Sequence, residues 1–162
     1  MPELPEVETI RRSLGPILGQ RIVGINFSPL APVETTTPST IQAALTGATV
    51  TTLRRWGKYL LMDTDRAATL VIHLGMSGKM LYARRGAIPA GGWSASGGNC
   101  APTKHLHLQI EFRGGDRLCL SDPRRFGTIS LSKKPDGGDN RFLQRLGPDY
   151  LDPRLTPKLF IQ

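Results

Sequence analysis

The sequence has 162 residues, with 21 Lys and Arg against 13 Asp and Glu, which gives a formal net charge of +8 and a pI of about 10.1. Its length suits one domain with a sizeable core, and its basic balance points to a polyanionic partner, most often nucleic acid, although ribosomal and membrane-surface proteins share it. The two cysteines, Cys100 and Cys119, are too few for a disulfide framework or a Cys-x-x-Cys zinc site, and they predict reduced thiols in a cytosol.

The first eight residues, MPELPEVE, place three carboxylates and two prolines at the N-terminus. If Met1 is removed, Pro2 becomes a terminal secondary amine that can attack an electrophilic carbon and form an iminium. An α-amine has a pKa of about 8 and a lysine of about 10.4, so the terminal amine is more often neutral and nucleophilic at pH 7. Glu3 is close enough to carry a proton for it. The structural alternative is that Pro2 starts a loop and that Glu3, Glu6 and Glu8 stabilise a helix N-terminus.

Residues 5–18 are predicted to form the first helix, because proline suits a first helical turn and acidic residues follow it. Gly15-Pro16 should end or bend this helix. Apolar residues recur at helical spacing and should form its buried stripe: Val7, Ile10, Leu14 and Ile17. Because the stripe anchors the helix, Pro2 and Glu3 are expected to be held in place. The acidic opening is unlike a signal peptide, and no apolar run approaches the roughly 20 residues of a membrane span.

The remaining elements are mostly strands, since β-branched and aromatic residues alternate with turn signals and the sequence holds 18 Gly and 13 Pro. Strands are predicted at 21–28, 48–56, 59–63, 68–74, 78–83, 105–112, 117–121 and 128–132. Short helices are expected up to residue 45, capped by Ser39 or Thr40, and at 141–146. The polar face of strand 105–112 should carry His105, His107, Gln109 and Glu111. Residues 84–103 should form a mobile loop with Trp93 as its anchor, and 155–162 should open another helix.

Residues 54–61, RRWGKYLL, place three cations beside an indole just before a hydrophobic strand. Arg54 and Arg55 could neutralise phosphates, and Lys58 could act as a catalytic cation. The alternative is a solvated basic strand end.

Residues 73–78, HLGMSG, place Met76 at a glycine-flanked strand end instead of within the strand. Enzymes that act on a base inside a duplex extrude it, and apolar wedges can fill the gap, so Met76 is a candidate wedge. An ordinary turn methionine is the alternative. His73 could contact phosphate or be a satisfied core histidine.

Residues 122–127, DPRRFG, combine two arginines and an aromatic ring in a tight turn. Guanidinium groups and a stacking ring suit insertion into a duplex and contact with an unpaired base. The alternative is a surface turn in which Asp122 pairs with one arginine.

In this order, MPELPEVET at the start, GKYL at 57–60, HLGMSG and DPRRFG resemble the N-terminal domain of bacterial formamidopyrimidine-DNA glycosylase. LGP at 146–148 resembles the end of that domain. The opening is specific, since the sister endonuclease VIII enzymes typically begin Pro-Glu-Gly-Pro-Glu. The resemblance covers about residues 1–150, with a loop at 84–103 that is longer than usual.

The resemblance implies a role for each matching residue. Pro2 would be the nucleophile that attacks C1′ of an oxidised purine nucleoside, and Glu3 the acid/base that protonates and opens the sugar. Lys58 would bind the flanking phosphate and Glu6 would support the site. The remaining residues are implied DNA contacts: Met76, Arg124 and Phe126 fill the space left by the everted base, Arg124 faces the orphaned cytosine, Arg125 adjoins it, and His73 and His105 contact phosphate. The family's usual Lys-His-Asp-His stands here as KHLH at 104–107.

The implied function is that of a bifunctional DNA glycosylase/AP lyase of base-excision repair. It would excise 8-oxoguanine and formamidopyrimidines through a Pro2 Schiff base, followed by β- and δ-elimination. The implied partner is double-stranded DNA containing oxidised purines or abasic sites. The expected protein is a monomer of the bacterial cytoplasm, associated with the nucleoid and with no membrane.

Family members also have a second half, a helix–two-turn–helix domain and a four-cysteine zinc finger. This sequence is expected to hold a catalytic domain at 1–150 and, at 151–162, the start of a truncated helix–two-turn–helix domain. It has no finger cysteines, so no metal or other cofactor is expected in this chain. Weak DNA binding and little glycosylase activity are expected, and the alternative is a catalytically weak or inert DNA-binding remnant.

A third alternative is an isomerase that uses an N-terminal proline as a base. Such an enzyme would need no basic surface, so the basic composition disfavours it.

The predicted fold is α+β. A two-layer, mainly antiparallel β-sandwich should be flanked by the N-terminal helix and by a second short helix.

Overall fold

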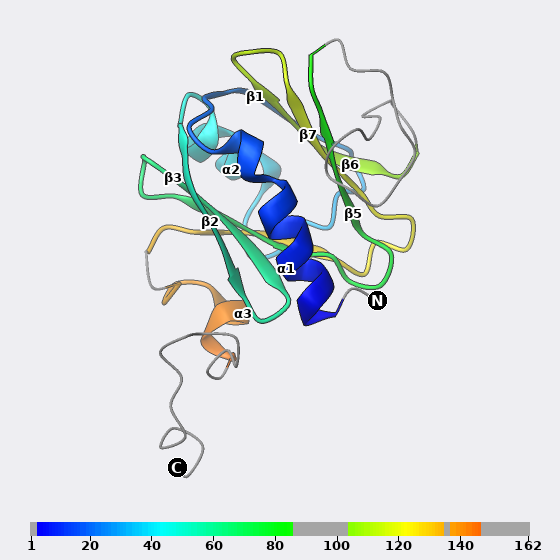
Figure 1. The fold of residues 1–162 in the computed structure, drawn as a ribbon. Coiled ribbons are helices and arrows are strands. Elements are labelled where there is room, and N and C mark those ends of the chain that lie inside the picture. Colours follow the sequence, from blue (N-terminus) through cyan, green and yellow to red (C-terminus); the bar gives the residue numbers. More distant parts are fainter. Residues whose placement is uncertain (1–2, 86–103, 135–136, 147–162) are drawn as a thin grey trace.

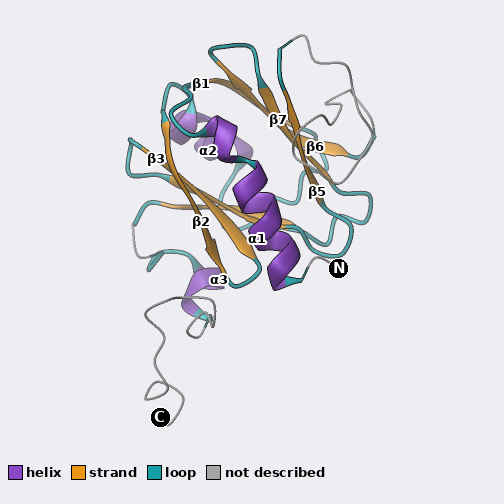
Figure 2. Ribbon diagram, viewed as in Figure 1, coloured by secondary structure: helices purple, strands orange, loops and turns teal. Residues whose placement is uncertain are grey.

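Eight strands and three α-helices form two antiparallel sheets with helices around them in the computed structural model, which describes residues 3–85, 104–134 and 137–146 (Figures 1 and 2). The helices are α1 (Leu4–Ser13), α2 (Pro38–Leu45) and α3 (Arg141–Gln144), with a 3-10 turn, η1, at Gly15–Ile17. The strands are β1 (Ile22–Phe27), β2 (Val50–Trp56), β3 (Tyr59–Thr64), β4 (Thr69–His73), β5 (Lys79–Ala83), β6 (Leu106–Phe112), β7 (Arg117–Ser121) and β8 (Thr128–Ser132). The predicted α+β sandwich is confirmed.

One sheet has the order β1-β6-β7-β5 and the other has the order β2-β3-β4-β8. In the second sheet Tyr59 pairs with His73, and His73 pairs with Thr128. The β2–β3 turn, the end of β4 and the start of β8 therefore lie at the same end of the sheet. This register brings three of the sequence motifs together, although they are far apart in the chain.

The apolar stripe of the first helix is buried as predicted. Val7, Ile10, Leu14 and Ile17 are between 0% and 8% exposed and join the core between the two sheets. α1 ends at Ser13 and the chain bends into η1, because Gly15-Pro16 cannot continue the helix. α1 packs against β2 and β3, and Figure 1 shows it running along the side of the sandwich, with its first turn near the N-terminus.

Two local predictions were wrong. The N-cap of α2 is Thr37, whose hydroxyl accepts a hydrogen bond from the Thr40 backbone N–H at 3.2 Å, because Pro38 occupies the first helical turn. His107 is 2% exposed instead of sharing a polar face. The pairing of β6 with β7 shifts between Leu106 and Leu108, so the alternation of faces breaks at this residue.

The prediction of reduced thiols is wrong for Cys119, which is fully buried in β7 and disulfide-bonded. The number of cysteines alone does not show whether folding brings two of them close enough to form a disulfide. Cys100, Trp93 and the predicted helix at 155–162 lie outside the described residues. Within the part of the chain that the structure describes, no helix is long and apolar enough to cross a membrane.

Candidate active site

Glu3 is the first described residue, and the start of α1 holds it in place. Pro2 lies outside the described residues. The Glu3 N–H donates to Glu6 Oε2 at 3.2 Å, and the Glu3 carbonyl accepts from the Val7 N–H at 3.0 Å. Glu3 and Glu6 therefore lie together at the N-terminal end of a helix whose other face is anchored in the core. The predicted anchoring of the N-terminus is confirmed for Glu3.

Lys58 lies beside this helix start. Its Nζ is 2.9 Å from Glu3 Oε2, and the two side chains are 29% and 58% exposed. Lys58 occupies the tight turn between β2 and β3, where Gly57 has φ of +59°, a conformation that glycine adopts readily. The structure thus places one acid and one cation together at the start of α1, in a position open to solvent.

Glu8 ties α1 to the strand that leads to Lys58. It accepts hydrogen bonds from Arg11 and Arg12 on its own helix and from Arg55 Nε at 3.0 Å. The hydrogen bond from Arg11 is the largest cause that lowers the pKa of Glu8 from 4.5 to about 2, against burial, which acts to raise it. Arg55, with a side chain only 6% exposed, also donates to the Gly57 carbonyl at 2.9 Å. One buried guanidinium therefore joins the helix to the turn that carries Lys58.

The two arginines of the RRWGKYLL segment are bound by carboxylates. Arg54 makes two hydrogen bonds to Asp63, at 2.6 and 2.9 Å, and Arg55 is held by Glu8. The prediction of a simple solvated basic strand end does not describe them. A pocket of about 300 Å³ beside Arg54 and Asp63 lies at the opposite end of β3 and β4, and Arg54 is the one candidate residue of the sequence analysis among those that line it.

His73 lies between the charged pair and the turn that follows β4. The Gly75 N–H donates to His73 Nδ1 at 3.0 Å, so Nδ1 is an acceptor and the proton of the neutral ring is on Nε2. Burial, and secondly the charge of Lys58, lower the pKa of His73 below 6.5. The ring also contacts Tyr59, with 4.8 Å between ring centroids. His73 is thus a neutral, half-buried N–H donor near Lys58 at pH 7.

The turns that carry Met76 and Phe126 lie against each other. A Cβ added to Gly75 would be 2.4 Å from the backbone N of Gly127, so the two backbones are in contact there. Met76 is 48% exposed and Phe126 is 61% exposed, although the glycines next to them in the chain, Gly75 and Gly127, are buried. Such exposure is unusual for large apolar side chains. The two predicted wedge residues are therefore neighbours on one end of the molecule.

The arginines of the DPRRFG turn are free cations. Arg124 and Arg125 are exposed, and their guanidinium groups make no hydrogen bond or ion pair with the described residues. Asp122 is 1% exposed and bonds to Ser77 Oγ and to the Gly127 N–H instead of to an arginine. The alternative of an Asp122–arginine surface pair is wrong, because the carboxylate points into the fold.

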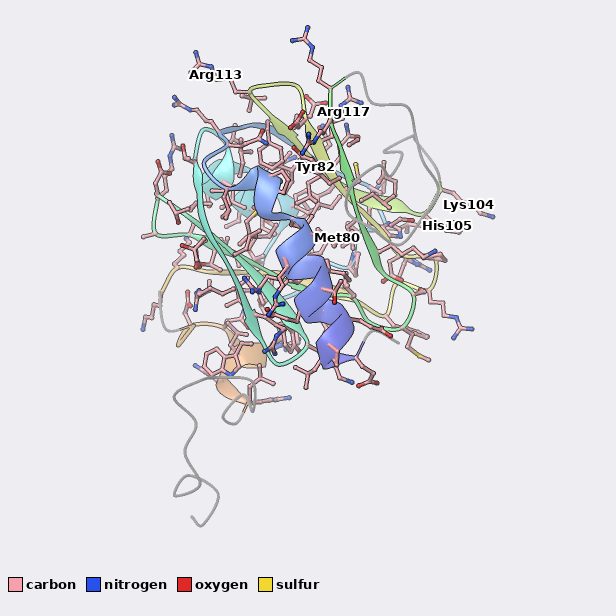
Figure 3. All side chains as sticks on the ribbon, in the orientation of Figure 1. Met80, Tyr82, Lys104, His105, Arg113 and Arg117 are labelled. Atoms are coloured by element: carbon pink, nitrogen blue, oxygen red, sulfur yellow. The ribbon has the colours of Figure 1, made fainter. Side chains whose placement is uncertain are left out.

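His105 is half-buried at the start of β6, and its carbonyl accepts from the Asp122 N–H at 2.9 Å. Figure 3 shows His105 and Lys104 together at the side of the molecule, whereas Arg113 and Arg117 lie at the far end of the same sheet. The excess positive charge is therefore spread over more than one end of the protein.

Sequence reasoning did not predict the connecting contacts between these parts, which are made by Glu8, Arg55, Ser77, Asp122 and His107. The spacing of Glu8 with Arg11 and Arg12 was a readable signal, since residues three and four apart on a helix are neighbours. The other connections depend on strand register. Within residues 3–85, 104–134 and 137–146, no group of three or more His, Cys, Asp or Glu side chains is placed to hold a metal ion.

Comparison with known proteins identifies a family. The formamidopyrimidine-DNA glycosylase N-terminal domain matches residues 1–129. The formamidopyrimidine-DNA glycosylase of Sphingopyxis alaskensis is 45% identical over 153 residues, which cover 93% of this chain and 50% of the relative. That of Roseobacter denitrificans is 39% identical over 151 residues, covering 93% of this chain and 52% of the relative. The chain spans about half the length of the curated relatives it matches.

Solved structures of this family show the same fold. The chain is similar to the Lactococcus lactis Fpg in complex with abasic-site DNA, with a TM-score of 0.66 and 35% identity over 80% of this chain and 43% of the other. It is equally similar to the same protein bound to DNA containing N7-benzyl-Fapy-dG, with a TM-score of 0.67 and 35% identity over 81% and 44% of the two chains. Both neighbours were solved with altered DNA bound.

Proposed function

Since the chain belongs to the formamidopyrimidine-DNA glycosylase family, we propose that it is the catalytic N-terminal part of a DNA glycosylase/AP lyase that removes oxidised purines and cleaves abasic sites. The observation that carries the proposal is the 2.9 Å pair of Lys58 and Glu3 at the start of α1. This pair supports the proposal because a carboxylate and a cation lie at Glu3, the residue that follows the proposed nucleophile in the sequence. The geometry suits amine attack on a sugar carbon that is flanked by phosphates.

The proposed chemistry begins at the nitrogen of Pro2, freed by removal of Met1. The amine attacks C1′, the bond from C1′ to the base breaks, and the base leaves with the bonding electrons. Glu3 takes the proton from the nitrogen and passes it to the sugar ring oxygen, which opens the ring and leaves an iminium. Loss of a proton from C2′ then expels the 3′ phosphate by β-elimination, and δ-elimination expels the 5′ phosphate.

The other residues of the site act on the DNA backbone and the base stack. Lys58 binds a phosphate next to the reacting sugar, and Glu6 supports Glu3 through its hydrogen bond at the helix start. His73 offers its Nε2–H to a phosphate oxygen, because Nδ1 is already used by the Gly75 N–H. His105 and Arg125 add further phosphate contacts from the neighbouring turn.

Met76, Arg124 and Phe126 fill the space that an everted nucleotide leaves in the duplex. Exposed apolar side chains at tight turns suit insertion between bases, and the exposed guanidinium of Arg124 can donate two hydrogen bonds to the base left without a partner. The substrate is therefore double-stranded DNA with an oxidised purine or an abasic site. The protein would act in the bacterial cytoplasm, where the nucleoid DNA lies.

Borohydride trapping tests the proposal. The wild-type chain, incubated with a duplex containing one abasic site and sodium borohydride, should form a covalent protein–DNA product. An abasic site is the more forgiving substrate, since no base needs to be excised. Pro2→Gly and a protein with a blocked N-terminus should lower the trapped yield strongly. A yield unchanged in both would remove Pro2 from its proposed role.

The second candidate is DNA binding without catalysis, which the net charge of +8 favours. A non-catalytic binder should lose affinity steeply as salt rises: the logarithm of its association constant should fall against the logarithm of salt concentration by about 0.9 per phosphate neutralised on B-DNA. It should give no trapped product. A wild-type chain that traps on abasic DNA would exclude this candidate.

A further inference from the structure

The turns that carry Met76 and Phe126 share one buried carboxylate. Asp122 Oδ1 accepts from Ser77 Oγ at 2.6 Å, and Asp122 Oδ2 accepts from the Gly127 N–H at 3.0 Å. The Ser77 hydroxyl oxygen accepts in turn from the Arg124 N–H at 3.1 Å. Ser77 belongs to the first turn, but two of its bonds end in the second. Each turn thus completes the hydrogen bonding of the other.

The backbones of these turns leave no room for independent motion. A Cβ on Gly75 would be 2.4 Å from Gly127 N, and a Cβ on Gly127 would be 2.5 Å from the His73 carbonyl oxygen. Real Cβ contacts are not this short, so the two turns touch main chain to main chain. Separating them would expose buried peptide groups as well as the Asp122 carboxylate.

Asp122 itself, directly after β7, is held by β6, the strand next to β7 in the same sheet. Its N–H donates to the His105 carbonyl at 2.9 Å, and its carbonyl accepts from His107 Nε2 at 2.9 Å. His107 is 2% exposed, and its Nδ1 is 2.8 Å from Ser28 Oγ. The main chain of Asp122 is therefore fixed by His105, just before β6, and by the buried His107 in β6.

We propose that Asp122 and Ser77 are positioning residues that make the Met76 turn and the Arg124–Phe126 turn one insertion unit, whose apolar side chains enter a duplex together. The proposal rests on the proposed function and extends it. Inserting a side chain into stacked bases costs unstacking, and a loosely held turn would also lose conformational freedom on binding. A preformed unit avoids the second cost. Its benefit is confined to duplex DNA, because a single strand has no stacked gap to fill.

Ser77→Ala is the test variant, and Ser77→Thr is the conservative variant that keeps the hydroxyl. Ser132→Ala is the matched control, because Ser132 Oγ donates to Asp139 Oδ1 at the same 2.6 Å outside both turns. Each protein is trapped with borohydride on an abasic duplex and on the same abasic strand alone. The measured quantity is the ratio of the duplex rate to the single-strand rate.

Ser77→Ala should lower this ratio about tenfold, the effect expected from losing one hydrogen bond to a charged group. Ser77→Thr should restore it, and Ser132→Ala should leave it unchanged. An equal loss on both substrates would mean that Ser77 only stabilises the fold and would overturn the proposal. No loss with Ser77→Ala would overturn it as well.

Amide hydrogen exchange without DNA separates this proposal from the proposed function. Ser77→Ala should speed the exchange of the Arg124 and Gly127 amides, which lie in the other turn, whereas Ser132→Ala should not. If the wild-type chain traps on neither substrate, the proposed function fails. The exchange rates alone then show whether Ser77 couples the Met76 turn to the Arg124–Phe126 turn. Unchanged exchange at Gly127 in Ser77→Ala would overturn the coupling of the two turns.

Discussion

His73 links the Lys58–Glu3 pair to the insertion turns, and its protonation state matters to both. Its Nδ1 accepts from the Gly75 N–H only while that nitrogen carries no proton. Because the folded protein lowers the pKa of His73 below 6.5, the unfolded chain binds this proton more readily than the folded chain. The contribution of His73 to stability is therefore complete above pH 6.5 and is lost as the pH falls below it.

His73→Asn tests this dependence, since an asparagine oxygen can replace Nδ1 as acceptor and does not titrate. Urea unfolding at pH 7 and pH 5 should show a smaller loss of stability in His73→Asn than in the wild type. The comparison cancels the other groups that titrate in this range. Equal losses in both proteins would contradict the assignment of His73.

Glu8 gives a second prediction at this scale. Its pKa of about 2 in the folded protein, against 4.5, means that its contribution is complete above pH 4.5 and is lost as the pH falls toward 2. Glu8→Gln should lower the free energy of unfolding by about 2 kcal/mol at pH 7, a value reduced for solvent screening. The difference from wild type should shrink to near zero at pH 2.

Glu34→Gln is the control for Glu8, because Glu34 pairs with Arg141 on the surface with both side chains about half exposed. This change should cost no more than about 0.5 kcal/mol. If the two variants lose the same stability, Glu8 is an ordinary surface acid and does not join α1 to β2.

Among the elements, the Met76 turn and the Arg124–Phe126 turn have the least room for an added side-chain atom at their glycines. Gly75→Ala would place a methyl group 2.4 Å from the Gly127 nitrogen and would force a non-glycine residue to φ of +59°. The free energy of unfolding should fall by at least about 2 kcal/mol. Thermal unfolding measures both variants. Gly114→Ala, where an added Cβ meets nothing within 4 Å, should leave the free energy of unfolding nearly unchanged. A neutral Gly75→Ala would contradict the close contact of the turns.

α3 depends on one buried amide. Asn140 Oδ1 accepts from the Phe142 and Leu143 N–H groups, and Nδ2 donates to Ser130 Oγ at 2.9 Å in β8. Asn140→Ala should cost about 2–3 kcal/mol, since it removes the helix cap and leaves a buried hydroxyl with one bond fewer. Denaturant titration measures the free energy of unfolding of both variants. Asn26→Ala, at an exposed position of β1, should lower it by less than about 0.5 kcal/mol.

The elements were largely predictable because their signals are local. The strands follow alternation and turn residues, and the stripe from Val7 to Ile17 follows helical spacing. The connections were less predictable. Asp122 and Ser77 meet because β4 pairs with β8 and β5 pairs with β7 in this register, and His107 turns inward at an irregularity between β6 and β7. Such pairings depend on tertiary structure, which a pattern in one segment does not contain.

At the scale of the whole molecule, three motifs converge at one end of the β2-β3-β4-β8 sheet. Glu3 and Lys58 form the charged pair, His73 lies beside Lys58, and Met76 and Phe126 project from the turns next to His73. This convergence supports the proposed division of labour, in which the helix start would perform the chemistry and the two turns would hold the duplex open. The chain spans about half the length of its relatives.

Mapping the trapped adduct tests the central claim most directly. After borohydride trapping on an abasic duplex, nuclease and trypsin digestion followed by mass spectrometry should locate the reduced sugar remnant. The account predicts that it lies on the nitrogen of Pro2, in the peptide PELPEVETIR, and that Met1 is absent from the trapped protein. A remnant on Lys58, or efficient trapping by a protein that retains Met1, would contradict it.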